Sequence, residues 1–234
     1  LIAQSLKFDG AVTLQILGGK GLRMLVMQVT SDLEMRGMAA AVEDTMAQSF
    51  ADLTRSAQCA VTVDSGKQPY QGIVAIEPTS LAASLEHYFE RSVQVPSHLA
   101  LVANDEVAGG VLLQQIPGET IAEDDWNRLR FLVDTLALKD FADDAGMQLV
   151  GKLFAEDDVR VYESRPVDFR CRCSAAKTED VLKMLGEAEA REALAEQGGI
   201  EVVCEYCGRR RHFVAVDVER MFTDNVVTSP DSLH

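Results

Sequence analysis

The sequence predicts an α+β protein in three parts: an N-terminal domain of antiparallel strands and helices over residues 1–117, a helical linker over residues 118–158 and a small cysteine-containing domain over residues 159–234. Three observations support this prediction. Short segments of alternating apolar residues, separated by turn residues, fill the first half of the chain. A helical apolar period follows Pro117-Gly118. Four of the five cysteines lie in two close pairs near the C-terminal end.

The first part of the chain is predicted to contain three strand pairs and a helix. Alternating apolar residues place the strands at residues 12–16, 22–26, 59–63, 71–77, 99–102 and 111–116. The helix is expected over Ser80–Phe89, where Leu81 and Leu85 share a face, and Pro96 ends the segment. No element is predicted for residues 35–58. Strands in runs, broken by a helix, are typical of an α+β domain.

The linker is predicted to be helical and amphipathic. Three acidic residues occupy its first turn, where the helix dipole favours negative charge. Its apolar face consists of Trp126, Leu129, Val133 and Leu136. The stripe is narrow and its surroundings are charged, so this helix has little surface that it must bury. Two interpretations remain open, a marginally stable linker and an ordinary docked helix pair.

The third part is predicted to be a small unit built around the cysteine pairs. An extended segment leads to the first pair, and a helix spans Glu179–Gln197 with an interruption at Gly186. A strand that begins at Ile200 and a strand that returns through Val218 form a hairpin with the second pair at its tip. A unit this small needs a staple, which a bound metal would supply.

The two pairs read Cys171-Arg172-Cys173 and Cys204-Glu205-Tyr206-Cys207. Cysteines one or two residues apart can aim both sulfurs at one point, and two such pairs supply the four thiolates of a tetrahedral zinc site. The pattern favours zinc over a metal-free dithiol centre at the second pair. Zinc can be a structural staple only, or part of a switch. The tight first pair, whose disulfide would close a strained ring, favours the switch, and the alternatives stay open.

Composition argues against several classes of partner. The formal net charge is −15, from 22 basic and 37 acidic residues, which opposes binding to phosphate backbones. The alternative function, a structural zinc-binding adaptor or nucleic-acid-binding module, has only Arg209–Arg211 and the cysteine hairpin in its favour. No apolar segment approaches the ~20 residues of a membrane-spanning helix. Paired thiols without secretory features indicate a reducing compartment, the cytoplasm.

The sequence contains no convincing set of nucleophile, base and acid, so the protein is predicted not to be an enzyme. A thiol–disulfide oxidoreductase would place its cysteine pair at the start of a helix, whereas here a hairpin is expected. The lone histidine His87 is interpreted as structural or exposed. Cys59, flanked by apolar residues, is interpreted as a buried, unreactive side chain.

Several motifs occur in order along almost the whole chain: Leu6–Gly10, Met35–Gly37, Tyr70–Gly72, Leu85–Pro96, Ala108–Pro117, Phe169–Ser174 and Cys204–Gly208. With them the chain resembles the thirty-three-kilodalton chaperonin family, redox-regulated heat-shock chaperones of the bacterial cytosol. The two cysteine pairs, with the spacing seen here, are specific to that family. The family has a further segment ahead of Leu6, so residues 1–117 are expected to form an N-terminally incomplete domain.

The resemblance implies an ATP-independent holdase that binds unfolding client proteins. It implies that the reduced, inactive form carries one zinc ion per chain on Cys171, Cys173, Cys204 and Cys207. Oxidation then joins Cys171 with Cys173 and Cys204 with Cys207, and the zinc domain and the linker unfold. The active form is expected to be a homodimer without nucleic-acid or membrane partners. Its client-binding candidates are Trp126, Leu129, Val133 and Leu136.

Overall fold

The computed structural model describes all residues except 7, 43–48, 67, 143–145 and 224–234. The chain divides into two compact units, Leu1–Phe169 (unit 1) and Arg170–His234 (unit 2), and each is described by itself. The residues predicted to form the linker, 118–158, belong to unit 1. Residues 224–234, the end of the predicted third part, lie outside the described residues.

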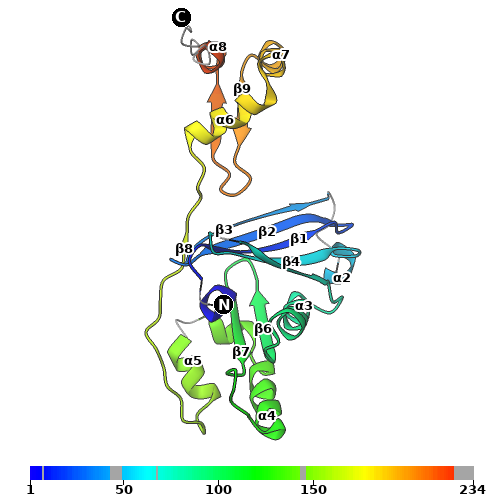
Figure 1. Ribbon diagram of the computed structural model, residues 1–234, viewed down its shortest axis with the longest axis vertical. Helices are drawn as coiled ribbons and strands as arrows, with labels where there is room; N and C mark the ends of the chain where they lie inside the picture. The colour runs from blue at the N-terminus through cyan, green and yellow to red at the C-terminus, as the bar shows by residue number, and fades with distance from the viewer. Residues whose placement is uncertain (7, 43–48, 67, 143–145, 224–234) are drawn as a thin grey trace, which may run out of the picture. The chain divides into compact units, whose positions relative to one another are not determined.

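Strands and helices make up both units, which confirms the α+β class (Figure 1). The elements of unit 1 are α1 (Ile2–Ser5), β1 (Ala11–Leu17), β2 (Leu22–Thr30), β3 (Glu34–Ala41), α2 (Phe50–Leu53), β4 (Gln58–Asp64), β5 (Tyr70–Ala75), α3 (Leu81–Tyr88), the π-helical turn η1 (Phe89–Val93), β6 (Ser97–Ala103), β7 (Ala108–Gln114), α4 (Glu123–Asp134), the 3₁₀ turn η2 (Leu138–Phe141), α5 (Gly146–Leu153) and β8 (Asp168–Phe169). The elements of unit 2 are α6 (Ala175–Leu185), α7 (Glu187–Gln197), β9 (Ile200–Val203), β10 (Arg210–Phe213) and α8 (Ala215–Thr223).

A six-stranded sheet in the order β5-β4-β1-β2-β3-β8 forms the framework of unit 1. Its strands pair antiparallel except β8, which runs parallel to β3 with Asp168 opposite Glu34. The six predicted strands are confirmed, with β6 and β7 forming a separate hairpin. Strand β3 lies where no element was predicted. It follows from pairing with β2, because its Ala- and Gly-rich sequence shows no alternation.

The core of unit 1 lies between the sheet and α3. Figure 1 shows α3 and the β6–β7 hairpin on one side of the sheet. Helix α3 begins where Ser80 Oγ accepts a hydrogen bond from Ala83 N at 3.0 Å, which satisfies one of the free N–H groups of the first turn. The buried residues of this core are Val12, Cys59, Val61, Val74, Leu85, Tyr88, Phe89 and Leu99. The position of Cys59, with an exposed fraction of 0%, fits its interpretation as a buried side chain.

The linker residues form α4, η2 and α5. Val133 is fully buried, whereas Trp126 and Leu129 are half-buried. Leu136 lies beyond the end of α4, so the prediction of one helical face of four residues is wrong at that position. Thr135 is the C-cap of α4, and Leu136 N, one residue further on, donates to Val133 O at 3.1 Å. Arg128 of α4 donates to Asp157, with Nη1 and Oδ2 3.1 Å apart, which joins the two helical segments of the linker.

Unit 2 packs three helices against the β9–β10 hairpin around a small core, whose buried residues are Leu182, Ala190, Ile200, Phe213, Val218 and Met221. The predicted interruption at Gly186 is confirmed, although the first helix begins at Ala175 rather than Glu179. The prediction that the returning strand continues through Val218 is wrong, because Val218 lies on α8. Asp217 Oδ2 accepts from Val214 N at 3.1 Å and supports the start of that helix.

Candidate metal centre

The structure brings the four paired cysteines together in unit 2. One sulfur from each of Cys171, Cys173, Cys204 and Cys207 lies within 4.8 Å of every other. The sulfurs of Cys171 and Cys204 are 3.6 Å apart, as are those of Cys173 and Cys207. All four are free thiols at this separation, because a disulfide bond would hold two sulfurs about 2.0 Å apart.

The first cysteine pair is held between the end of β8 and the start of α6. Ser174, which directly follows Cys173, is the N-cap of α6, and its Oγ accepts a hydrogen bond from Lys177 N at 3.2 Å. The pair therefore lies at the N-terminal end of an 11-residue helix. The positive end of the helix dipole favours thiolates there.

The second pair occupies the turn between β9 and β10, as the sequence predicted. Cys204 N donates to Arg209 O at 3.0 Å, and Gly208 N donates to Cys204 O at 2.8 Å. Gly208 has a φ of 67°, a left-handed conformation that glycine adopts without strain. These bonds close a compact turn that aims both sulfurs to the same side.

Backbone groups of each turn point at the first cysteine of the pair. Burial raises the pKa of the Cys171 thiol to about 12, although the Cys173 N–H donates to its sulfur and acts in the opposite direction. Burial also acts to raise the pKa of Cys204. There, the N–H groups of Cys207 and Tyr206 and the neighbouring thiols together outweigh it and lower the pKa to about 7. Cys204 therefore becomes a thiolate more readily than Cys171.

The donor set fits a zinc ion. Four thiolates that bind zinc at about 2.3 Å stand about 3.8 Å apart at the corners of a tetrahedron, close to the sulfur separations found here. Backbone N–H donors to sulfur stabilise bound thiolates and fix their orientation. Chemically, the cluster can hold a metal ion or form disulfides, because its sulfurs are close together and half-buried.

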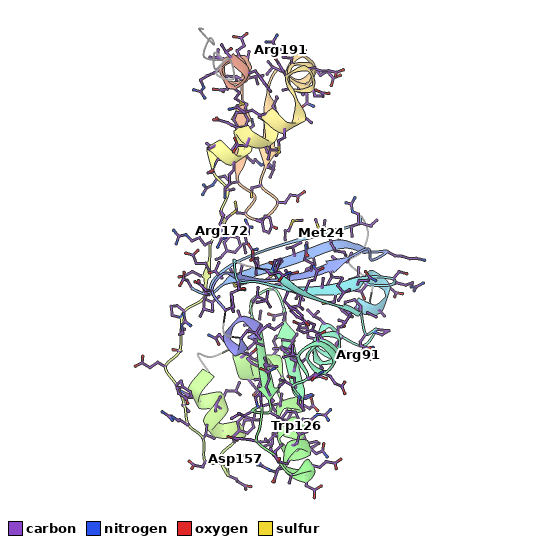
Figure 2. All side chains as sticks on the ribbon, viewed as in Figure 1. Met24, Arg91, Trp126, Asp157, Arg172 and Arg191 are labelled. Carbon is purple, nitrogen blue, oxygen red and sulfur yellow. The ribbon has the colours of Figure 1, made fainter. Side chains whose placement is uncertain are left out.

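Basic residues accompany the cysteines. Arg172 lies between the first two, and Figure 2 shows it at the opposite end of unit 2 from Arg191 of α7. Lys177 Nζ donates to the carbonyl oxygen of Arg172 at 3.0 Å. In the predicted arginine run, Arg210 forms an ion pair with Glu201 at 2.9 Å, so part of the charge that a nucleic-acid partner would need is neutralised.

The four predicted client-binding residues all belong to unit 1, whereas the four paired cysteines belong to unit 2. Trp126 and Leu129 line an open cavity between α4 and the end of β7, together with Leu113, Ile116 and Ile121. The side chain of Val133 is fully buried, so it could contact a client protein only if α4 separated from its neighbours in unit 1. Within the described residues, no helix is both long and apolar enough to cross a membrane.

Two histidines of unit 1 contact carboxylates. His87 Nδ1 lies 3.0 Å from Glu77 Oε1, in accord with a structural role. His98, which the sequence did not single out, is buried, and its Nε2 lies 2.7 Å from Asp134 Oδ1. These two residues are 36 positions apart, and no short motif connects them, so no sequence signal could have found the contact.

Comparison with known proteins agrees with the fold. The family model described as "Hsp33 protein" matches residues 1–214. Proteins named "33 kDa chaperonin" from Methylobacillus flagellatus and Nitrosococcus oceani are both 38% identical to this chain, and each alignment covers 97% of it and 79% and 78% of the relative, respectively. The crystal structure of the 33 kDa chaperonin of Thermotoga maritima superposes with a TM-score of 0.81 at 24% identity, over 97% of this chain and 82% of that one.

The family match spans most of the chain, and the curated relatives point to the same family. The chain belongs to the Hsp33 family, whose members are chaperones and not enzymes.

Proposed function

We propose that this protein is a redox-regulated, ATP-independent holdase of the cytoplasm. It would bind unfolding client proteins after oxidation of zinc-bound cysteines and act as a homodimer. Three working parts are proposed: the client-binding and dimerisation domain (1–117), the linker (118–158) and the switch domain (159–234). The observation that carries the proposal is the meeting of four free thiols within 4.8 Å in a unit whose core has few buried side chains.

The proposed resting state has one zinc ion on Cys171, Cys173, Cys204 and Cys207. Such an ion would hold all four cysteines as thiolates and contribute about 10–16 kcal/mol of apparent folding free energy, as in small zinc peptides. The six buried residues of unit 2 are a small core for a unit that begins at Arg170, so its stability without metal is expected to be a few kcal/mol at most. Loss of the thiolates would therefore unfold unit 2.

Oxidation is proposed to form disulfides within each pair, Cys171 with Cys173 and Cys204 with Cys207. Each disulfide would form as two thiolates give up two electrons, and one peroxide molecule accepts these electrons together with two protons from the solvent to become two molecules of water. The 3.6 Å sulfur contacts join one pair to the other, so the alternative pairing of Cys171 with Cys204 is geometrically available. Peptide mapping of the oxidised protein distinguishes the two pairings.

Release of the linker is the proposed link to client binding. Trp126, Leu129, Val133 and Leu136 would offer apolar surface to clients once α4 separates from β6. In this structure the apolar surface of Val133 is fully buried, and that of Trp126 and Leu129 is half-buried. This supports the idea that α4 must be released before a client can bind there. Exposed apolar surface of this kind is what a holdase needs to compete with aggregation.

The test follows zinc and holdase activity together. The zinc-loaded chain is treated with peroxide at mildly raised temperature, zinc is measured with a chromogenic chelator, and light scattering reports aggregation of a heat-unfolding client enzyme. We expect one zinc per chain to be released as client protection appears, and the same result for the control Cys59→Ala. Zinc that stays bound, or leaves without any gain in protection, would make the cysteines a structural staple and refute the proposal.

A further inference from the structure

Outside the cysteine cluster, His98 makes a side-chain contact that joins the linker helix α4 to strand β6. It lies on β6, with only 7% of its surface exposed. Carboxylates from two different helices approach its two ring nitrogens. Glu86 comes from α3 in the core, and Asp134 is the last residue of the linker helix α4. We call these three residues the His98 latch.

Of the two contacts that His98 makes in the latch, only one is a hydrogen bond. Nε2 of His98 lies 2.7 Å from Asp134 Oδ1 and forms a hydrogen bond with it. Nδ1 lies 2.8 Å from Glu86 Oε1, but the angle is not that of a hydrogen bond. The same Glu86 oxygen accepts from Leu99 N at 2.7 Å, so the carboxylate is anchored to the core strand next to His98. The imidazole is thereby held between a fixed core carboxylate and the end of the linker helix.

Asp134 lies at an unfavourable position for a carboxylate, and the contact with His98 offsets this. A carboxylate at the C-terminal end of a helix faces the negative end of the helix dipole and is unfavourable there. Helix α4 has no basic residue in its last turn to compensate. Asp134 accepts a hydrogen bond from His98, and Val133, the preceding residue, is fully buried. The hydrogen bond and the buried valine therefore act on the same turn of the helix.

We propose that the His98 latch holds the linker helix α4 on the core of unit 1 and sets how readily the linker is released. His98 is then a positioning residue: it contacts no client and acts through Asp134 on the residues that do. This inference rests on the proposed function, because release of the linker is what the latch would control.

The test uses Asp134→Asn in the zinc-loaded, reduced chain. Removal of the charge relieves the unfavourable end of the helix, so the helix alone should become more stable. The latch predicts the opposite, about tenfold faster hydrogen exchange of residues 123–134, because the asparagine amide can replace the charged, partly exposed hydrogen bond only with a weaker neutral one. Strands β1 and β4 should keep their exchange rates. Trp126, the single tryptophan of the chain, should become more accessible to a soluble quencher.

Two matched variants separate the latch from general effects. His87→Gln removes another imidazole–carboxylate pair, in which both side chains are half-exposed and neither belongs to α4, and Asp105→Asn removes an exposed carboxylate from the β6–β7 turn. Both should leave the exchange of α4 unchanged. In the double variant His98→Gln with Asp134→Asn, the second substitution should add nothing to the first, because the two residues act through one contact.

The outcomes are decisive. Unchanged or slower exchange of α4 in Asp134→Asn overturns the latch, and so do additive effects in the double variant. After peroxide treatment, Asp134→Asn should reach full client protection earlier than the parent chain. If α4 opens as expected but neither protein protects clients after oxidation, the latch stands and the proposed holdase function fails.

Discussion

Leu182 offers the sharpest test of the idea that metal binding and folding of unit 2 are one event. It lies on α6, with 4% of its surface exposed, and packs into the core that contains Ile200 and Phe213. Truncation of a buried leucine to alanine costs about 2–5 kcal/mol. If unit 2 is unfolded without metal, the whole cost appears in the apparent zinc affinity. Leu182→Ala should then bind zinc about 30-fold to about 4,000-fold more weakly.

The assay is competition for zinc between the reduced protein and a chromogenic chelator at fixed pH. Met184→Ala is the matched control, because Met184 lies on the same helix but is 79% exposed and should leave the affinity unchanged. Heat unfolding of unit 1, whose core is separate, should be the same in both variants.

An affinity of Leu182→Ala within about threefold of the parent would refute the reasoning, since unit 2 would then fold before it binds metal. Equal losses in Leu182→Ala and Met184→Ala would also refute it, because burial would not explain the effect.

Three further predictions concern unit 1. Gly151 lies in the interior of α5, and an added Cβ would have no atom within 4 Å. Gly151→Ala should therefore stabilise that helix by about 0.5–1 kcal/mol. Slower hydrogen exchange of α5 and a later onset of client protection after oxidation would show this. Gly72→Ala should destabilise the core, because the new Cβ would lie 2.5 Å from a Tyr88 ring carbon; a lower urea midpoint would show this. Burial raises the pKa of Cys59 to about 11, above its ordinary value of 9.0. The contribution of the protonated Cys59 thiol to folding stability should be fully present below about pH 9 and be lost as the pH rises toward 11. Native Cys59 should therefore resist alkylation at neutral pH, as measured by mass spectrometry.

Alternation along the strands was enough to predict most of the sheet, because one face of each strand is buried and the other is not. Strand β3 escaped prediction for a physical reason. Gly37 lies against the side chain of Met27 on β2, and antiparallel pairing with β2, not apolar alternation, holds the strand in place. The returning strand of the hairpin was predicted too long because valines at positions 214, 216 and 218 suit a strand as well as a helix start.

The candidate site could be predicted to a large extent because each cysteine pair is local. Spacing alone suggested that Cys204 and Cys207 share a turn, and the turn bond from Gly208 N to Cys204 O accounts for that geometry. The latch could not be predicted, since His98 and Asp134 meet only after β6 and α4 have packed. Contacts of this kind depend on tertiary structure and leave no period or motif in the sequence.

Strand β8 has a consequence for how far unit 2 could move if the proposed switch operates. The segment between α5 and β8 has no helix or strand, and its end is tied to the sheet by the Asp168 N to Leu33 O hydrogen bond at 3.2 Å. Only Asp168 and Phe169 pair with β3, one residue before unit 2 begins. Asp157 stays bound to Arg128, so detachment of these two residues would turn residues 158–169 into a tether with a reach of about 40 Å. An unfolded unit 2 could then search a much larger volume around the same molecule, including any client held there.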